Sequence, residues 1–286
     1  MTGREHQLSL PPPLAPLYVK AAVTGPLHRG AELPGSLYTL ADRLIDADHL
    51  ADYQRVCGFP VSDVVPPTYL HVLAFPLSMA LMTEPAFPVP IVGAVHIANA
   101  ITVARQLRSA EPVAFQVRAA DLQQHPAGRK FDLLAEAAAG GETVWTARST
   151  YLRREKRADG GRGQRRRSQT SPPEGLAVRI RVAGDIGRKY AAVSGDRNPI
   201  HLHPLAARLF GFPSAIAHGM WVKARTLATL EGRLPDAFTV EVDFKLPVPL
   251  RSTVAVVTAR ERGGWLLDVR DAGSGKPHLT GSVLPA

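Results

Sequence analysis

The chain has 286 residues and a net charge of +9, and its 45 % hydrophobic and 21 % charged residues describe a globular protein with enough apolar material for a core. No apolar run approaches the roughly 18 to 20 residues of a membrane span, and charges and prolines occupy the N-terminus where a signal peptide has its apolar core, so we expect a cytoplasmic protein. The single cysteine, Cys57, excludes an internal disulfide bond and a multi-cysteine zinc site, which suits a reducing compartment.

The length exceeds the usual size of one domain, so we expect two domains or a fused pair. In the first half, residues 75–83 (FPLSMALMT) predict a central helix with Pro76 in its first turn. Alternating apolar residues then predict antiparallel strands, within 92–107, 113–123, 130–139 and 142–153.

A basic segment follows these strands. Residues 153–168 (RREKRADGGRGQRRRS) carry eight Arg or Lys and two acids, a net of 8 − 2 = +6, so the rest of the chain holds only 9 − 6 = +3. We interpret 153–175 as a flexible linker between an N-terminal domain, 1–152, and a C-terminal domain, 176–286. A patch that attracts the phosphates of a coenzyme or carrier is an alternative. Binding to nucleic acid is a further one, although the segment has no aromatic side chains for base stacking.

The second half shows the same plan more clearly. Residues 176–184 alternate as a strand, 203–212 predict a short helix stopped at Gly211, and 218–232 predict a longer helix ended by Gly232. Four more strands are expected within 238–247, 252–261, 265–271 and 278–284. The two halves therefore predict an α+β pair in which each antiparallel sheet wraps a helix.

A short match supports this repetition. Tyr53, Cys57 and Gly58 have the same spacing as Tyr190, Ser194 and Gly195. A polar cluster follows the second of these sets and brings an acid, an amide and two histidines together within a few residues: Asp196, Asn198, His201 and His203.

Three interpretations of this cluster are open from its residues alone. Asp196 and Asn198 could be plain turn formers. Asp196, His201 and His203 could hold a metal, although a catalytic zinc site wants three ligands with supporting contacts, and Pro204 suggests that His203 begins the next helix. The third interpretation is an acid–base site, for which Asn198 is well placed because a residue before proline is extended and leaves the cluster on a loop.

The motif resembles a known family. "YAAVSGDRNPIHLHPLAARLFGFPSAIAHGMW" (190–221) is similar to the signature of MaoC-like dehydratases and (R)-specific enoyl-CoA hydratases, which have the hotdog fold. The layout resembles actinobacterial double-hotdog 3-hydroxyacyl-thioester dehydratases. His203 departs from the family pattern, which usually has an acidic residue there.

The resemblance implies the (R)-specific interconversion of trans-2-enoyl and 3-hydroxyacyl thioesters of coenzyme A or acyl carrier protein. It also implies that Asp196 and His201 are the catalytic pair, that Asn198 helps to arrange them and the water, and that the N–H of Gly219 contacts the thioester oxygen. Tyr190 and Ser194 are expected as supporting residues. For His218 we favour a structural role over a role as a second base.

The chemistry by itself favours these residue types. Hydration of an enoyl thioester needs a base for water, a group that holds the water and returns a proton, and a donor for enolate charge. Histidine titrates near neutral pH, so His201 suits the base role. Asp196 can hold the water and share in proton transfer, more effectively if burial raises its pKa. Gly219 begins a helix, where N–H groups are free, so no metal or other cofactor is required.

In the first half Gly58 is followed by Phe59, Pro60, Val61 and Ser62, with no Asp, Asn or His at the positions that match the second-half cluster, which predicts one active site per chain. We hypothesise that this half gave up catalysis to make room for a longer acyl chain, because the residues of its helix, 72–82, are apolar and flexible. The alternative function is a non-catalytic acyl-thioester-binding accessory protein. We expect no nucleic-acid or membrane partner, and either a monomeric pseudo-dimer or a homodimer.

Overall fold

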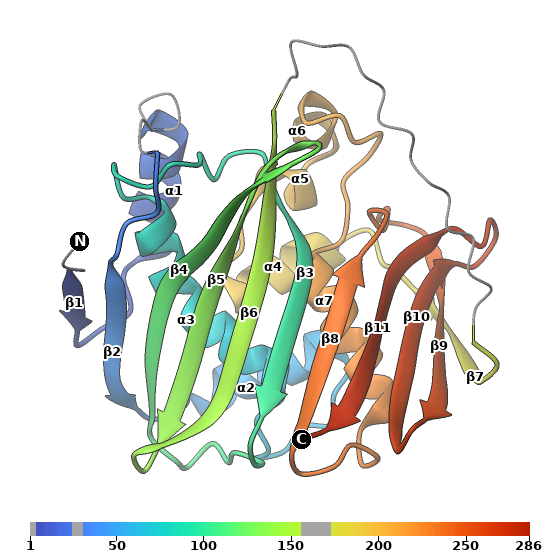
Figure 1. The fold of residues 1–286 in the computed structure, drawn as a ribbon. Coiled ribbons are helices and arrows are strands. Elements are labelled where there is room, and N and C mark those ends of the chain that lie inside the picture. Colours follow the sequence, from blue (N-terminus) through green and yellow to red (C-terminus); the bar gives the residue numbers. More distant parts are fainter. Residues whose placement is uncertain (1–3, 25–30, 156–172) are drawn as a thin grey trace.

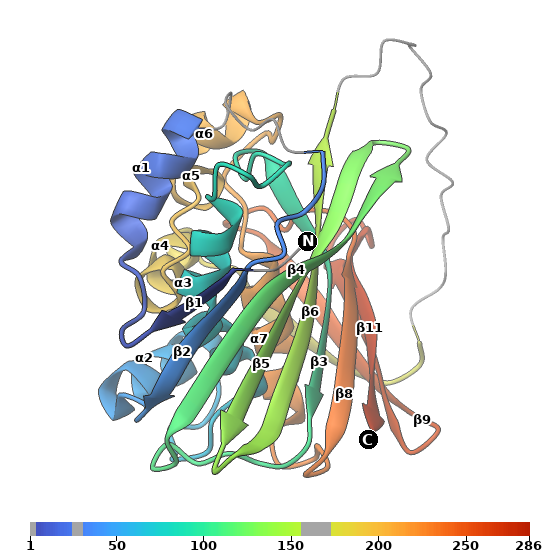
Figure 2. The same cartoon turned by 60° about the vertical axis from the view of Figure 1, so that its left-hand side comes forward.

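The computed structural model describes residues 4–24, 31–155 and 173–286, and its strands form one continuous sheet (Figure 1). The helices cover one face of this sheet and leave the other face uncovered (Figure 2). The α+β prediction is confirmed. The two expected sheets are, however, joined edge to edge into one sheet of eleven described strands, in the order β1-β2-β4-β5-β6-β3-β8-β11-β10-β9-β7.

The first half of the chain contributes six strands and three helices among the described residues. In chain order they are β1 (Glu5–Leu8), α1 (Leu14–Thr24), β2 (Leu37–Arg43), α2 (Ala47–Cys57), α3 (Pro67–Met82), β3 (Ala94–Val103), β4 (Val113–His125), β5 (Gly128–Ala139) and β6 (Glu142–Arg154). The four strands expected from alternation, β3 to β6, are confirmed. The elements before residue 58 carried no predicted strand or helix.

The second half follows the same order of elements. They are β7 (Leu176–Arg181), α4 (Ile186–Ser194), α5 (Pro199–Leu202), α6 (Pro204–Leu209), α7 (Gly219–Leu227) with a 3-10 turn (Ala228–Leu230), β8 (Phe238–Phe244), β9 (Thr253–Glu261), β10 (Gly264–Asp271) and β11 (Pro277–Pro285). All five predicted strands and both predicted helices are confirmed, and Gly211 and Gly232 follow the helices with positive φ.

The sheet order shows that the two halves are repeats. One half reads β2-β4-β5-β6-β3 from its edge to the middle, and the other reads β7-β9-β10-β11-β8. The repeats meet where β3 pairs antiparallel with β8, from Ala98 opposite Asp243 to Val103 opposite Phe238. The matched spacing is confirmed as well, because α2 ends at Gly58 with φ +76° and α4 ends at Gly195 with φ +71°.

The central helix of the first repeat differs from its prediction. It begins at Pro67, eight residues before the expected start, so Pro76 lies in its interior and not in its first turn. Twelve of its sixteen residues are buried, so the helix is apolar nearly all round and shows no amphipathic period that could mark its start. Pro67 at the first helical position marks that start instead.

A buried lysine fastens the two repeats under the sheet. Lys223 of α7 is fully buried, and its Nζ donates to Asn99 Oδ1 of β3 at 2.6 Å, to Asn99 O at 3.1 Å and to Val240 O of β8 at 3.1 Å. Burial lowers the pKa of Lys223 well below its usual value. Three acceptors match the three donors of an ammonium, so α7 is anchored on the strand pair that joins the repeats.

The predicted linker lies mostly outside the described residues. Strand β6 runs on to Arg154, so it enters the proposed linker, most of which (156–172) lies outside the described residues together with most of its positive charge. The division at 152 and 175 therefore stays a prediction. No helix in the described part of the chain is long and apolar enough to cross a membrane.

Candidate functional site

The loop after α4 sets the positions of the predicted acid and base. Gly195 ends α4 in the left-handed conformation, and the chain then turns through Asp196 to Asn198. Asn198 has φ −56° and ψ 123°, the extended conformation expected before Pro199. Its side-chain oxygen accepts from Ile200 N–H at 3.3 Å and caps α5, the short helix that carries His201. Asn198 thus places an extended residue between Asp196 and the short helix that carries His201.

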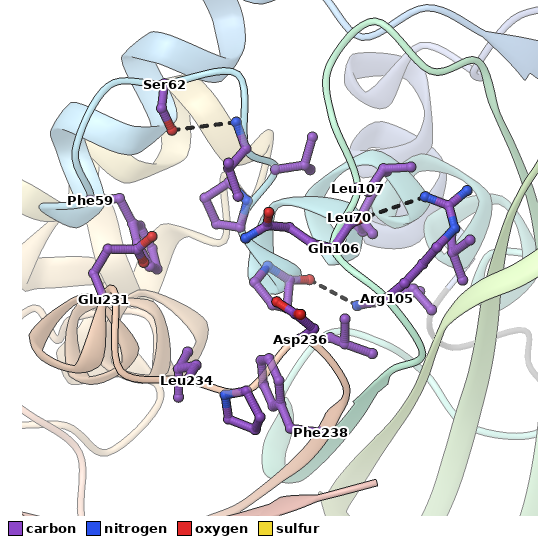
Figure 3. Close-up of a pocket in the computed structure, with 18 of the residues that line it drawn as sticks. Phe59, Ser62, Leu70, Arg105, Gln106, Leu107, Glu231, Leu234, Asp236 and Phe238 are labelled. Carbon is purple, nitrogen blue, oxygen red and sulfur yellow. Dashed lines mark hydrogen bonds between the residues drawn. The ribbon is translucent and has the colours of Figure 1, made fainter.

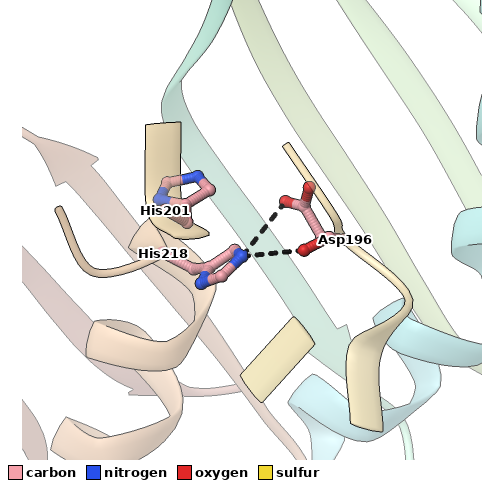
Figure 4. A group of neighbouring side chains, drawn as sticks. All are labelled: Asp196, His201 and His218. Carbon is pink, nitrogen blue, oxygen red and sulfur yellow. Dashed lines mark hydrogen bonds and ion pairs between the residues drawn. The ribbon is translucent and has the colours of Figure 1, made fainter. Parts of the chain in front are cut away.

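Three side chains converge at this loop: Asp196, His201 and His218 (Figure 4). Each offers an atom within 4.8 Å of the other two. His218 precedes α7, and its ring stacks on that of His201 with centroids 3.7 Å apart and planes 27° apart. Both imidazoles are buried and face the carboxylate, so the cluster consists of one carboxylate and two imidazole rings.

The hydrogen bonds fix which nitrogen of each ring carries the proton. His201 Nδ1 lies 2.9 Å from Ile216 O, and a carbonyl oxygen only accepts, so Nδ1 is the donor and Nε2 keeps its lone pair. His218 Nε2 donates to Asp196 O at 3.0 Å for the same reason. His218 Nδ1 is then a buried lone pair without a hydrogen-bond partner. His201 therefore presents a basic Nε2, and His218 holds the backbone of Asp196.

The electrostatics favour an ionised acid beside neutral histidines. Burial raises the pKa of Asp196, but His218, His201 and the hydrogen bonds from Asn198 N–H and Tyr18 together outweigh it and leave the pKa below its ordinary value. The condition under which Asp196 would share in proton transfer more effectively, a pKa raised by burial, is thus not met, because the charges of His218 and His201 and then the two hydrogen bonds act in the opposite direction. Burial lowers the pKa of His201, and it lowers the pKa of His218 to about 3.

The remaining predicted residues surround this cluster. Ser194 Oγ accepts from Asp196 N–H at 3.2 Å and supports the loop. Tyr190 of α4 is buried with its ring 4.9 Å from that of His218. Gly219 is the first residue of α7, whose first N–H groups have no partner within the helix. A Cβ on Gly219 would lie 3.0 Å from the Phe244 ring, so glycine leaves the helix start close to this ring.

The metal interpretation does not hold with the predicted ligands. His203 Nδ1 accepts from Leu205 N–H at 3.3 Å and caps α6, as its position before Pro204 suggested. The described residues contain one group with suitable metal-ligating atoms, and it includes His218 in place of His203. Its two rings are stacked, so their in-plane lone pairs run side by side and do not converge on one ion, and His218 Nε2–H is already a donor.

The first repeat supplies residues that the sequence did not reveal. The ring of Phe244, which lies beside Gly219, is 5.1 Å from the ring of His96 on β3. The His96 ring in turn stacks on that of Tyr151 on β6, with centroids 4.7 Å apart. His71 of α3 stacks 6.0 Å from His96, and burial lowers the pKa of His71 to about 4. No spacing signal connects these residues with Asp196, since they come from three elements of the other repeat.

Tyr18 of α1 was also missed. Its hydroxyl lies 3.3 Å from Asp196 Oδ1 and accepts from Arg197 N–H at 2.8 Å. The two residues are 178 positions apart, and Tyr18 lies before β2, outside the elements that repeat among the described residues. No local pattern could therefore have indicated this contact.

A cavity of about 120 Å³ marks the matching position in the first repeat (Figure 3). It is lined by the loop after α2, by the start of α3 and by the end of β3, as well as by Phe238 of β8. These are the counterparts of the loop after α4, the start of α7 and the end of β8. Phe59 and Ser62 stand in this loop, and no Asp or His of the loop lines the cavity.

The comparisons with known proteins agree with this architecture. The model of the MaoC-like domain matches residues 170–269. The chain is 38 % identical, over 257 residues, to 3-hydroxyacyl-thioester dehydratase X of Mycobacterium tuberculosis, which covers 89 % of this chain and 91 % of that protein. The chain belongs to the MaoC-like dehydratase family.

Solved structures of this family have the same fold. A crystal structure of the M. tuberculosis protein superposes with a TM-score of 0.78 at 36 % identity, covering 87 % of this chain and all (100 %) of that one. A MaoC-like dehydratase from Phytophthora capsici gives 0.68 at 17 % identity, over 87 % of this chain and 94 % of that one, and shows the likeness of fold alone. The resemblance seen in the sequence and the double-hotdog fold are therefore confirmed.

Proposed function

We propose that this MaoC-like chain interconverts trans-2-enoyl and (R)-3-hydroxyacyl thioesters, with Asp196 and His201 as its catalytic pair. The chain is a hydro-lyase of the hydratase and dehydratase type, as its relatives are named 3-hydroxyacyl-thioester dehydratase X and 3-hydroxybutyryl-CoA dehydratase. Those names support an acyl thioester of fatty-acid metabolism as the substrate class. The assignment of individual residues rests on the site geometry.

The observation that carries this proposal is the gap between acid and base. Asp196 and His201 each offer an atom that lies no more than 4.8 Å from the other, so both can contact one water or one substrate hydroxyl bound beside them. His201 Nε2 is a lone pair and Asp196 is ionised, so both accept from the same water. A plain binding protein would have no use for such a pair.

Hydration then proceeds with balanced proton transfers. His201 Nε2 takes a proton from the water as the water oxygen bonds to C3 of the enoyl group. The electron pair of the C2=C3 double bond moves toward the thioester oxygen, and Asp196 stabilises the imidazolium. The proton taken up by His201 then passes to C2, and dehydration is the reverse of these steps. Gly219 N–H, at the start of α7, faces the developing negative charge on the thioester oxygen together with the positive end of the helix dipole.

One active site per chain remains our proposal, and the start of the central helices supports it. Pro66 precedes α3 with φ −60° and ψ 137°, while His218 precedes α7 with φ −66° and ψ 137°. The residue after each begins its helix, and in the first repeat this is Pro67, which has no N–H. The first repeat therefore lacks the oxyanion donor as well as the acid and the base.

Several finer points stay predictions. A preference for longer acyl chains rests on the apolar residues of α3. A cytoplasmic location rests on the lack of a long apolar run and suits the single cysteine. The resemblance covers thioesters of both coenzyme A and carrier protein, and the chain is expected to be either a monomeric pseudo-dimer or a homodimer.

The test is an assay of enoyl-thioester hydration with crotonyl-CoA and longer analogues, in which the loss of the enoyl chromophore measures the rate. We expect Asp196→Asn and His201→Ala each to lower kcat by about 10³-fold or more while the fold is retained, because each removes one partner of the water. His203→Gln, an exposed histidine seven positions from Asp196, is the matched control and should keep wild-type turnover. Full activity of both site variants would favour the non-catalytic thioester-binding alternative.

A further inference from the structure

Helix α1 lies outside the repeated plan and covers the catalytic loop (Figure 2). Its Tyr18 reaches three groups of that loop with one hydroxyl. The oxygen accepts from Arg197 N–H at 2.8 Å, and its hydrogen is shared between Gly195 O at 3.1 Å and Asp196 Oδ1 at 3.3 Å. The first half of the chain thus contacts the predicted acid of the second half directly.

The docking of α1 depends on the glycine before the acid. A Cβ on Gly195 would collide with Leu14 of α1, and φ at Gly195 is +71°. Its counterpart Gly58 also has a positive φ, but the three atoms nearest to a Cβ there belong to the guanidinium of Arg225. The nearest neighbour of the glycine is thus α1 at the catalytic loop and an arginine of α7 at the matching loop.

Tyr18 contacts one of the two carboxylate oxygens of Asp196 and not the other. Oδ1 accepts from Asn198 N–H at 3.1 Å and faces the Tyr18 hydroxyl. Oδ2 lies 3.9 Å from His218 Nε2, too far for a hydrogen bond, and points toward the two imidazoles (Figure 4). Burial raises the pKa of Tyr18, so its hydroxyl stays a donor at working pH.

We infer that Tyr18 is a positioning residue that holds Asp196 by Oδ1, so that Oδ2 is the oxygen that receives the water or the substrate hydroxyl. This inference rests on the proposed function for its role in turnover. The geometry itself, with one oxygen occupied and one open, does not depend on the substrate.

The test replaces Tyr18 by Phe, which keeps the ring and removes the hydroxyl. We expect kcat for crotonyl-CoA hydration to fall about tenfold with KM changed less than twofold, because the substrate does not touch Tyr18 but the acid loses its orientation. The matched control is Tyr38→Phe, since Tyr38 on β2 is another buried phenol, its pKa is raised by burial and by Glu84, and it stacks on His6. The control should keep the wild-type kcat.

A second readout needs no turnover. The Asp196 carboxyl carbon, assigned by comparison with Asp196→Asn, is titrated by NMR in wild type and in Tyr18→Phe. Loss of a donor to the carboxylate should raise the pKa of Asp196 in the variant and leave it unchanged in Tyr38→Phe. The other titratable groups that act on this site are the same in all three proteins: His71, Tyr151, Tyr190, His201 and His218.

The outcomes separate this inference from the proposed function. An active wild type with unchanged kcat and unchanged Asp196 titration in Tyr18→Phe overturns the positioning role alone. A wild type inactive on every enoyl thioester overturns the function, while the titration still tests the contact. If Tyr18→Phe does not fold, Leu14→Ala shortens the side chain that packs on Gly195 and loosens the docking of α1 while the Tyr18 hydroxyl is kept, and it should raise the Asp196 pKa in the same direction.

Discussion

The rings of His201 and His218 stack with centroids 3.7 Å apart, and only one of them keeps a lone pair toward the open side of Asp196. His218 Nε2–H donates to Asp196 O, whereas His201 Nδ1–H donates to Ile216 O. The carbonyl that each ring contacts therefore leaves His201 as the base and makes His218 a support for Asp196. The stack also excludes water from one face of each ring.

His218 supports the acid through the backbone, so its replacement should reduce turnover without removing the base. In His218→Phe the ring packing is kept, but Asp196 O loses its donor. We expect kcat to fall about 10- to 100-fold, less than in His201→Ala, because a buried hydrogen bond is lost. A steady-state assay with crotonyl-CoA measures this, and a kcat within twofold of wild type would show that the loop holds its shape without His218.

The pH profile of hydration should extend below the ordinary range of histidine. The active form needs an ionised Asp196 and a neutral His201, and the pKa of each is lowered in the folded protein. We expect kcat/KM to stay level as the pH falls past 6.5, since His201 is not yet protonated there, and to decline only at lower pH. Measured rates from pH 5 to 9 check this, and half-maximal activity at or above pH 6.5 would contradict it.

The same burial should make the fold sensitive to acid. The pKa of His218 is about 3 in the folded chain, so between pH 6.5 and 3 the unfolded chain binds a proton that the folded chain does not. Stability from this group is complete above pH 6.5 and is lost as the pH falls, at about 1.4 kcal/mol per pH unit. Urea denaturation at several pH values should show a shallower pH dependence for His218→Phe than for wild type. The exposed His203→Gln is the control and should keep the wild-type slope.

Gly219 should be sensitive to a single methyl group. A Cβ there would lie 3.0 to 3.2 Å from three atoms of the Phe244 ring, so Gly219→Ala must displace this ring or the start of α7. We expect kcat to fall about tenfold or more, because the N–H would shift away from the thioester oxygen. In the double variant Gly219→Ala/Phe244→Leu the smaller side chain relieves the crowding, and part of the activity should return. An equally inactive double variant would show that crowding by Phe244 is not the cause.

Local sequence determined a large part of this protein. Alternation of apolar residues indicated nine of the strands, and Pro199 and Gly195 fixed a loop whose conformation follows from their own backbones. The order Asp196, Asn198, His201 and Gly219 was visible because these residues lie within one short stretch of chain. The same locality explains why His203 could be assigned to a helix start from the proline after it.

Tertiary structure decided what the local pattern could not carry. The early start of α3 was hidden because a helix buried nearly all round has no amphipathic period. The pKa of Asp196 depends on donors from three separate segments, and the most distant, Tyr18, is 178 positions away. The anchoring of α7 through Lys223 likewise needs β3 and β8 side by side. The sequence determined the reactive groups by short-range spacing, whereas their protonation and orientation arose only when folding brought distant elements together, since hydrogen bonds and charges act over distances in space and not along the chain.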